Sequence, residues 1–392
     1  MKKYIKTCLF ILFFTFSLYL NAEVVSSSKF EYTIDFPEGF FIEDMSKDER
    51  SILFKNEFFP IQAIIRIWES DIFLNAKENL KYTMEKLNAE GEIAETKWRN
   101  QSCAISQISI KKNSFNENMK GWAISVPLHS KDFFTMLLYA PQEKSTDLEQ
   151  IILSVLDSII IDQGCYTEAG IITNFAFPKT NQEKIEINVN NRIITSYLNQ
   201  SDKEANQFVI DREFAVFKFY STTKFWKESW QRFYRLIAKD SIGRTKRLSF
   251  DIYANLYEDA LTKKVSNINL YIAQEILYWV QSFNYQRKSS DPNKADYSNL
   301  VDTIRNNGSD CDSRSLLAMV LLKNMNIDAC MFISVAYSHA MLGVCIPDTQ
   351  GQTFKLDNKE YLFGETTQKN LTLGKIASDM QDRKKWIPVE MY

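Results

Sequence analysis

The chain has 392 residues and a nearly balanced charge, with 47 Lys plus Arg against 49 Asp plus Glu. This length allows two or three domains with ample core, and the charge balance argues against nucleic acid or anionic lipid as a partner. Gly (11) and Pro (8) are few beside 28 Phe and 18 Tyr, which argues against a fibrous or disordered protein.

Residues 1–22 have the pattern of a secretory signal peptide. Three lysines precede an apolar run from Cys8 to Leu20 that is too short to span a bilayer comfortably, and Ala22 is a small residue directly before a polar segment. We expect cleavage after Ala22 and export to the periplasm or outside the cell, with no membrane contact of the mature chain. An uncleaved N-terminal anchor is the alternative, because Leu20 is not ideal three residues before a cut.

Residues 23–162 are expected to form one α+β unit, a sandwich with an antiparallel sheet. Apolar and polar residues alternate from Phe30 to Phe36, as in a half-buried strand, before the turn Pro37-Glu38-Gly39. Further strands are predicted at 51–54, 61–68, 103–110, 122–128 and 133–139, and amphipathic helices at 76–87 and 148–156. The run YTIDFPEGF and the helix ILSVLDSIII resemble the PsbP-like and DcrB-like α/β sandwich, which implies a fold and no chemistry. His129 is expected to be a lone histidine without a catalytic role.

Residues 163–264 form a middle α+β region, either a separate domain or an extension of the unit that follows from residue 265. Strands are predicted at 185–189, 193–198, 214–220 and 248–256. Aromatic residues between Phe225 and Ile237 recur at helical spacing, which is more often the buried face of a helix than a ligand platform. Four arginines in this region are expected on a solvated face: Arg232, Arg235, Arg244 and Arg247.

A polar run near the C-terminus, Asn307-Gly308-Ser309-Asp310-Cys311, is soon followed by the apolar stretch from Leu316 to Leu322. This order predicts the start of a buried helix, with Asp310 or Ser309 as the N-cap and Cys311 in the first turn. The helix dipole and the unpaired backbone N–H groups there favour a thiolate over a thiol. Cys311 is therefore the candidate nucleophile, and we expect its pKa to be lowered.

His339 and Glu365 are the candidate partners of Cys311. His339 starts a strand pattern, 340–346, that follows another at 329–335, and Glu365 comes after a third at 360–363. An acid at the end of the strand beside a histidine can hold the imidazole in the right tautomer, so the order Cys, His, Glu predicts a triad. The nearest rival acid is Asp357, which we expect to be solvated at a turn.

This ordered set resembles the transglutaminase-like cysteine peptidase superfamily, and more closely a bacterial and archaeal branch of it. The matching stretches are VQSFNY (280–285), SDCD (309–312), Leu316-Leu317, HAMLGV (339–344), YLFGETT (361–367) and Gly374. The resemblance implies that residues 265–392 form a papain-like helix-plus-antiparallel-sheet domain with Cys311, His339 and Glu365 as its triad. Two departures from the common pattern are Ser309, where a Gly is usual, and Glu365, where the superfamily more often has Asp.

An acyl-transfer site also needs hydrogen-bond donors aimed at the developing oxyanion. The Cys311 backbone N–H is the first candidate. A helix is predicted over 267–283, and the resemblance places its end beside the cysteine, so that Gln281 or the indole N–H of Trp279 is the candidate second donor. The alternative is that Trp279 packs and Gln281 caps the helix end.

The cysteines predict at least one free thiol. Loss of Cys8 with the signal peptide leaves an odd number, namely Cys103, Cys165, Cys311, Cys330 and Cys345. A disulfide between Cys330 and Cys345 is one alternative, but small buried cysteines on neighbouring strands are more often free. No Cys-x-x-Cys pair occurs and the two histidines are isolated, so we expect no metal and no cofactor.

The expected function is that of an exported cysteine peptidase or amidase, acting on a peptide or protein substrate through a thioester on Cys311. A cross-linking transglutaminase, in which an amine resolves the same thioester, is one alternative. Hydrolysis ranks higher because nothing in the chain resembles the calcium-dependent accessory domains of the eukaryotic cross-linking enzymes. A non-catalytic binding module that retains the fold is the other alternative.

Overall fold

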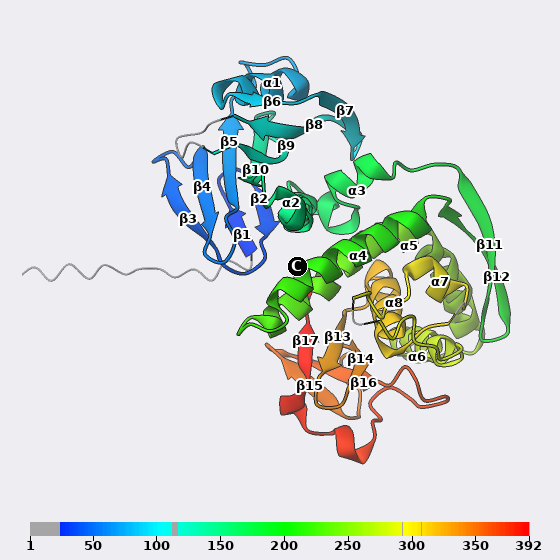
Figure 1. Ribbon diagram of the computed structural model, residues 1–392. Helices are drawn as coiled ribbons and strands as arrows, with labels where there is room; N and C mark the ends of the chain where they lie inside the picture. The colour runs from blue at the N-terminus through cyan, green and yellow to red at the C-terminus, as the bar shows by residue number, and fades with distance from the viewer. Residues whose placement is uncertain (1–23, 112–116, 292, 307, 392) are drawn as a thin grey trace, which may run out of the picture.

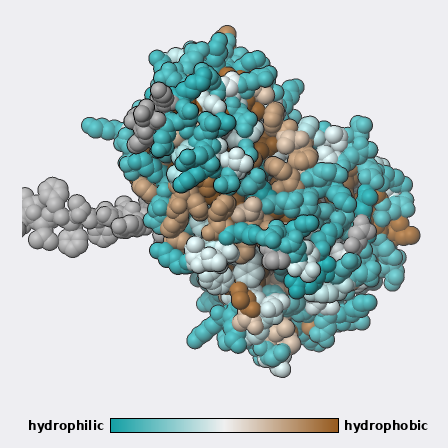
Figure 2. Space-filling view, in the orientation of Figure 1, coloured by the Kyte–Doolittle hydropathy of each residue, from teal (hydrophilic) through white to brown (hydrophobic). Residues whose placement is uncertain are grey.

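The computed structural model describes residues 24–111, 117–291, 293–306 and 308–391. The predicted signal peptide lies outside these residues. Two lobes that each contain an antiparallel sheet are joined by long helices, so the predicted α+β class is confirmed (Figure 1). Within the described residues, no helix is both long and apolar enough to cross a membrane. Most of the face in Figure 2 is hydrophilic, and apolar residues gather mainly where the lobes meet.

The N-terminal lobe is built on an eight-stranded antiparallel sheet in the order β3-β4-β5-β10-β9-β8-β6, with β7 paired to β8. Its strands are β3 (Phe40–Met45), β4 (Ser51–Asn56), β5 (Gln62–Trp68), β6 (Ala89–Glu90), β7 (Ile93–Trp98), β8 (Gln101–Ile110), β9 (Met119–Pro127) and β10 (Phe133–Pro141). A separate hairpin pairs β1 (Val24–Ser27) with β2 (Tyr32–Asp35). Ala63, Ile65 and Ile67 of β5 are buried and their neighbours are not, which is the period of a strand.

Two helices cover opposite faces of this sheet. They are α1 (Ala76–Lys86) and α2 (Ser145–Ser158), and both confirm helices predicted from the sequence. On β8, Ala104 belongs to the core cluster under α1, whereas Cys103 and Ile105 belong to the larger cluster under α2. The chain then leaves the lobe through η1 (Gln163–Thr167) and α3 (Ile171–Ala176).

The middle region is a hairpin followed by two long helices. Its elements are β11 (Gln182–Val189), β12 (Arg192–Asn199), α4 (Asp202–Tyr220) and α5 (Trp226–Thr262). The strands predicted at 185–189 and 193–198 are confirmed, but those predicted at 214–220 and 248–256 are wrong, because both stretches are helical. Leu248, Ile252 and Leu256 are buried at a spacing of four, while Phe250, which completed the apparent alternation, is 63% exposed.

The C-terminal lobe has helices followed by a five-stranded antiparallel sheet in the order β15-β16-β14-β13-β17. The elements are α6 (Ile268–Gln281), α7 (Leu300–Ile304), α8 (Cys311–Asn324), β13 (Ala329–Ser334), β14 (His339–Val344), β15 (Thr353–Leu356), β16 (Lys359–Gly364), η2 (Ser378–Met380), η3 (Arg383–Lys385) and β17 (Ile387–Val389). α8 packs against β13 and β14 and also contacts α5. A single hydrophobic core contains residues of both the middle region and this lobe.

Buried ion pairs join the N-terminal lobe to α4 and α5. Arg212 pairs with Asp157 of α2, and Arg235 Nε lies 2.7 Å from Asp35 Oδ2 of β2. Arg232 donates to the main-chain oxygen of Asp35 at 2.8 Å. The prediction of a solvated arginine face is therefore wrong for Arg232 and Arg235, because both extend into the contact between the lobes.

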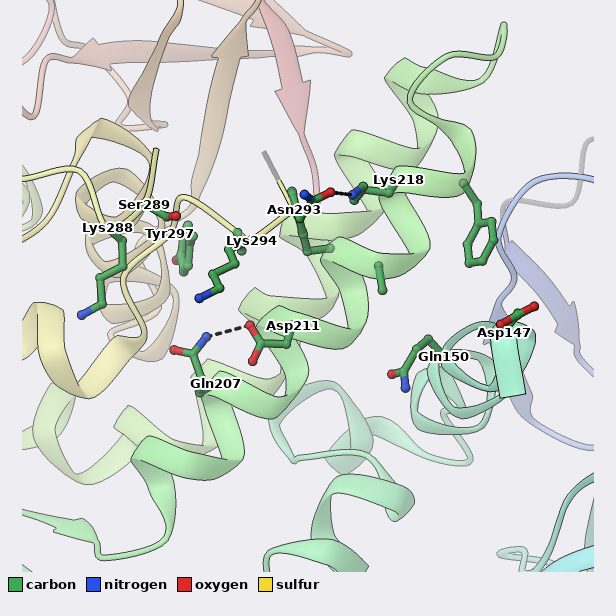
Figure 3. A pocket seen from close by; sticks show the side chains of 14 residues that line it. Asp147, Gln150, Gln207, Asp211, Lys218, Lys288, Ser289, Asn293, Lys294 and Tyr297 are labelled. Carbon is green, nitrogen blue, oxygen red and sulfur yellow. Dashed lines mark hydrogen bonds between the residues drawn. The ribbon is translucent and has the colours of Figure 1, made fainter. Parts of the chain in front are cut away.

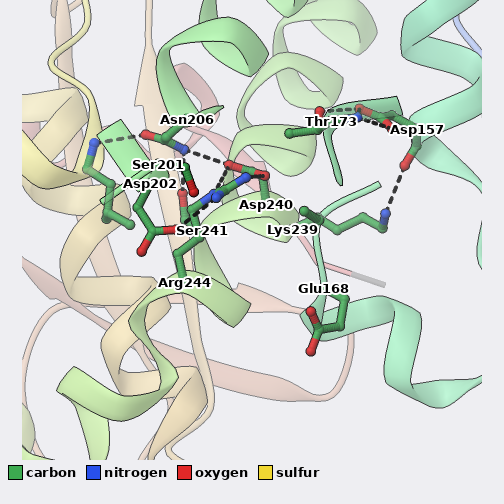
Figure 4. Close-up of polar contacts among 12 residues, drawn as sticks. Asp157, Glu168, Thr173, Ser201, Asp202, Asn206, Lys239, Asp240, Ser241 and Arg244 are labelled. Carbon is green, nitrogen blue, oxygen red and sulfur yellow. Dashed lines mark hydrogen bonds and ion pairs between the residues drawn. The ribbon is translucent and has the colours of Figure 1, made fainter. Parts of the chain in front are cut away.

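A second group of buried charges lies along α4 and α5 (Figure 4). The Arg244 guanidinium bridges Asp240, at 2.6 Å, and Asp202, at 2.9 Å, so it too is not solvated. Asn206 donates to Asp240 at 2.9 Å and accepts from the Leu300 backbone at 2.8 Å, which ties α4 to the start of α7. Of the four arginines, Arg247 has the exposed side chain that was expected, at 58%.

Candidate active site

Cys311 is the first residue of α8 and follows a tightly held turn, so the predicted helix start is confirmed. Asp310 is the N-cap, and its Oδ1 accepts hydrogen bonds from the Ser313 backbone N–H at 3.0 Å and from the Ser313 hydroxyl at 2.8 Å. Gly308 has φ +93°, and a Cβ there would lie 2.5 Å from the Gln286 side chain. Local hydrogen bonding and this glycine therefore set the direction in which the chain enters α8.

His339, on β14, and Glu365, directly after the neighbouring strand β16, contact each other. His339 is the first residue of β14, Glu365 follows β16, and His339 Nε2 lies 2.8 Å from Glu365 Oε2. The other carboxylate oxygen accepts from the Thr367 N–H at 2.7 Å and hydroxyl at 2.5 Å. Burial alone would raise the pKa of Glu365, but the hydrogen bonds from His339 and Thr367 lower it below its ordinary value. Glu365 thereby favours the Nε2–H tautomer and leaves Nδ1 for a reacting group.

The packing of α8 against β14 brings Cys311 beside the strand that carries His339. The backbone N–H of Ala340, the residue after His339, is near enough to the thiol to act on its pKa. The structure thus places the three predicted triad residues in one site. In the described residues, however, the hydrogen bond of Cys311 Sγ goes to Asp312 Oδ1 at 3.4 Å and not to the imidazole.

The charges around Cys311 do not favour a thiolate. Burial and the carboxylates of Asp312 and Asp310 raise the pKa of the Cys311 thiol, with the Ala340 N–H acting in the opposite direction. The expected lowering of this pKa is therefore wrong. A helix N-terminus is equivalent to roughly half a positive charge, which burial and two neighbouring carboxyl groups outweigh. Burial also raises the pKa of Asp310, to about 6.

Two groups at this site were not identified from the sequence as parts of it. Asp312 lies beside Cys311 and accepts a hydrogen bond from the hydroxyl of Tyr234, on α5, at 2.5 Å. Burial raises the pKa of Tyr234 well above its ordinary value, so it remains a donor at neutral pH. The motif SDCD was a signal for Asp312. No sequence signal pointed to Tyr234, which reaches the site only through the packing of α5 on α8.

The two candidate oxyanion side chains have other contacts. Gln281 Nε2 donates to the main-chain oxygens of Glu365, at 2.8 Å, and Leu371, at 2.9 Å. Both of its donor hydrogens are therefore in use, and Gln281 offers none to an oxyanion in this conformation. Trp279 is 2% exposed and packs edge-on against Phe283, as the alternative interpretation held. The Cys311 backbone N–H remains the candidate donor.

The other residues singled out in the sequence make no contact with the triad in the described part of the chain. Cys330 and Cys345 are free thiols, as are the remaining described cysteines. The His129 side chain is 66% exposed, and Asp357 is exposed with φ +52° at the turn before β16. In the ranges that the structure describes, no three His, Cys, Asp or Glu side chains are placed to hold a metal ion together.

A cavity of about 970 Å³ lies next to the segment that precedes α7. Its walls come from α2, from α4 and from residues 288–297, with Lys294 directed toward Gln207 and Asp211 (Figure 3). Lys218 of α4 donates to Asn293 at 2.8 Å. None of the triad residues lines this cavity. Packing connects it with the site, because its residue Tyr297 contacts the ring of Tyr234 at 6.2 Å between centroids.

Comparison with known proteins gave no family assignment, because no protein-family model and no curated protein matches the chain. Among solved structures, the PsbP protein of Synechocystis is similar at 15% identity and a TM-score of 0.30, covering 36% of this chain and 91% of its own. A protein from Bacteroides thetaiotaomicron is similar at 11% identity and a TM-score of 0.26, covering 63% of this chain and 80% of its own.

LpqN, which is involved in cell envelope biogenesis of Mycobacterium tuberculosis, is similar at 12% identity and a TM-score of 0.24, covering 33% of this chain and 81% of its own. A PsbP protein is thus among the structural neighbours, and PsbP is the type that the N-terminal pattern resembles. Similarity of this degree carries no conclusion about function. The transglutaminase-like character of the C-terminal lobe stays a prediction from its motifs.

Proposed function

We propose that the protein is an exported, transglutaminase-like cysteine peptidase or amidase that acts on a peptide or protein amide through Cys311. The observation that carries the proposal is the 2.8 Å hydrogen bond between His339 Nε2 and Glu365 Oε2, on the sheet against which the Cys311 helix packs. A carboxylate bonded to imidazole in this way fixes the tautomer and stabilises the imidazolium that forms during acyl transfer.

The proposed reaction has two halves. First, the Cys311 thiol proton moves to His339 Nδ1, an S–C bond forms at the substrate carbonyl, and the C–N bond breaks as the imidazolium protonates the leaving amine. Water then attacks the thioester carbonyl while its proton moves to His339, the C–S bond breaks, and His339 returns the proton to the Cys311 sulfur, which leaves a carboxylic acid and the free thiol. Glu365 stays ionised throughout, and the Cys311 backbone N–H at the helix N-terminus donates to the oxyanion.

The raised pKa of Cys311 determines which variant of this mechanism fits. At neutral pH the resting nucleophile is a thiol that donates to Asp312, not one half of a preformed thiolate–imidazolium pair. The thiol must turn from Asp312 to His339 when the substrate enters. The mechanism is therefore general-base catalysis, in which proton removal accompanies attack.

The same contact between Cys311 and Asp312 favours a second candidate function, a non-catalytic binding module. A thiol held by a carboxylate in a buried site is a poor nucleophile until that contact is broken. In this function the lobe would bind a peptide without cleaving it, and Cys311 would stay inert.

The test uses the mature chain, residues 23–392, incubated in ¹⁸O-labelled water with a protein mixture and a biotin-linked primary amine. A hydrolase incorporates ¹⁸O into new carboxylates, a cross-linker attaches the biotin-linked amine to acyl groups, and Cys311→Ser abolishes either product. Absence of both products, together with failure of Cys311 to react with iodoacetamide at neutral pH, would contradict the enzyme and support the binding module.

Export is tested separately on the full-length chain expressed with its N-terminal segment. N-terminal sequencing of the protein released from the periplasm or medium should find Glu23 first. An intact Met1 on a membrane-bound product would support the anchor instead.

A further inference from the structure

Arg314 is a buried cation on α8, close in sequence to the candidate nucleophile Cys311. It lies one turn after Cys311 on α8 and is 1% exposed. Within the described residues its guanidinium forms no ion pair with a carboxylate and bonds to neutral oxygens instead. An arginine stays charged even when buried, and burying that charge without a direct ion pair is costly even though the charges of Asp310 and Glu365 act on it. Such a residue is expected where its hydrogen bonds serve a purpose other than stability.

The hydrogen bonds of Arg314 connect three separate segments of the chain. Nη2 donates to the main-chain oxygen of Phe283, after α6, at 2.8 Å. Nε donates to the Ser309 hydroxyl, in the turn before Cys311, at 3.1 Å. Nη1 donates to the main-chain oxygen of Thr366, directly after Glu365, at 3.3 Å. Only the planar fork of an arginine can reach acceptors in three directions from one buried position.

The hydrogen bonds of Arg314 join two parts of the site that are far apart in the sequence, the start of α8 and the turn after β16. Cys311 is held by the local start of α8, whereas Glu365 is held by the end of β16, far away in the chain. Thr366 adds a second link, because its hydroxyl lies 3.2 Å from that of Ser315 on α8. Arg314 therefore spans the distance between the nucleophile's helix and the turn that carries the acid.

We propose that Arg314 is a positioning residue, whose guanidinium fastens the helix start at Cys311 to the turn after Glu365 and so keeps nucleophile and orienting acid in one relative placement. This inference rests on the proposed function, because the placement has a catalytic consequence only if Cys311 reacts. The Arg314 charge also favours the ionised form of Cys311, against the carboxylates of Asp310 and Asp312.

Ser309 is part of the same arrangement. At this position the resembling sequences usually have Gly, which offers no side-chain acceptor. Here the hydroxyl of Ser309 is fully buried and receives the Nε–H of Arg314, so the departure from the common pattern provides one of the three contacts.

The first readout is the imidazole of His339, observed by NMR of protein labelled with ¹⁵N-histidine. The chain has only 2 His, so a His129→Gln background leaves the His339 signals alone. The Nε2–H proton bonded to Glu365 should resonate far downfield in the parent protein. In Arg314→Gln and in Arg314→Lys this signal should be lost or move upfield, because neither side chain can bond all three segments.

The second readout is the rate of iodoacetamide alkylation of Cys311, followed by mass spectrometry across neutral and alkaline pH. Arg314→Gln removes the charge and should slow alkylation at neutral pH about tenfold, as a tenfold smaller thiolate fraction requires. Arg314→Lys keeps a charge and should react nearly as fast as the parent. The matched control is Arg247→Gln on exposed α5 surface, which should change neither readout.

A folded Arg314→Gln protein with the parental His339 signal and alkylation profile would overturn the proposal. If both Arg314 variants fail to fold, Ser309→Ala decides the question, since it removes one acceptor and should change both readouts in the same direction by a smaller amount. No change in Ser309→Ala would then overturn it. Neither readout needs a substrate, so a shifted His339 signal without amide turnover would refute the proposed function and leave the positioning role intact.

Discussion

Two groups of buried charges in the described residues differ in how their charges are paired, namely the group at the junction between the lobes and the group around Cys311. At the junction between the lobes, the carboxylate of Asp157 meets Arg212 and that of Asp35 meets Arg235, so each negative charge has a cation beside it. Around Cys311, the carboxyl groups of Asp310 and Asp312 form no ion pair with a cation in the described residues. Arg314, one turn away, forms none with a carboxylate.

This difference in pairing suits different roles: the charges at the junction hold the two lobes together, whereas the charges around Cys311 belong to the proposed active site. Paired charges with further hydrogen bonds hold a contact in one geometry and keep their groups ionised, as Asp157 and Glu213 do when they raise the pKa of Arg212 against the effect of burial. Around Cys311, burial and then the neighbouring carboxyl groups raise the pKa values of both Cys311 and Asp310. Perturbed groups of this kind cluster at functional sites. The contrast agrees with the proposal that chemistry occurs at Cys311, although burial also lowers the pKa of Lys239 at the junction.

The largest expected effect concerns the acid of the triad. Glu365→Gln should lower turnover by roughly 10³ to 10⁴-fold with little change in thermal stability, because the imidazole loses its tautomer and its counter-charge. Glu365→Asp should be intermediate, since the charge survives but the reach is shorter. Turnover of the ¹⁸O-labelling substrate measures this, with Asp357→Asn as the control. A fully active Glu365→Gln enzyme beside an inactive Asp357→Asn enzyme would transfer the role to Asp357.

The next largest effect should appear at the junction. Asp157→Asn removes one of the two carboxylates that pair with the buried Arg212, which keeps Glu213, and should lower the free energy of unfolding by about 3 kcal/mol. Urea unfolding measures the loss, and the alkylation rate of Cys311 in the folded variant should not change. Asp251→Asn, which breaks a surface pair with Arg247, should cost less than about 1 kcal/mol. Equal losses in the two variants would show that burial does not distinguish these pairs.

A smaller effect of opposite sign is expected at the N-cap. The pKa of Asp310 is raised by burial from 3.8 to about 6, so the group stabilises the fold below pH 4 and loses that contribution as the pH rises through 6. Asp310→Asn keeps a capping oxygen and removes the charge. It should therefore raise the free energy of unfolding at pH 7 by about 2 kcal/mol and flatten its pH dependence between pH 4 and 6. A variant less stable than the parent at pH 7 would contradict this sign.

The smallest expected effect is on the nucleophile itself. Asp312→Asn removes a negative charge beside Cys311 and should lower the pKa of the thiol, so that alkylation at neutral pH becomes roughly 3–10-fold faster, or about 1 kcal/mol. Cys345 in the same protein is an internal control, because it lies outside this site. Slower alkylation of Cys311 would mean that Asp312 acts as a proton acceptor for the thiol and not as an opposing charge.

The sequence by itself predicted most of the local features of the site. The helix that starts at Cys311 follows from Asp310 and Ser313, whose hydrogen bonds lie within one turn. The strands that carry His339 and precede Glu365 follow from short apolar runs bounded by polar turns. The strand prediction failed where the apolar pattern fitted both a strand and a helix, as at Leu248 to Leu256. Only the packing of α5 decided which of these side chains were buried.

Tertiary structure alone decided the electrostatics of the site and the contacts that hold it. Tyr234, Gln281 and Arg314 come from different helices, and no local pattern marks the main-chain oxygens or the carboxylate to which they donate. The sign of the Cys311 pKa shift likewise depends on burial and on the sum of several charges. A sequence lists those charges, but their distances and their exclusion from water arise only when α5, α6, α8 and the C-terminal sheet pack together.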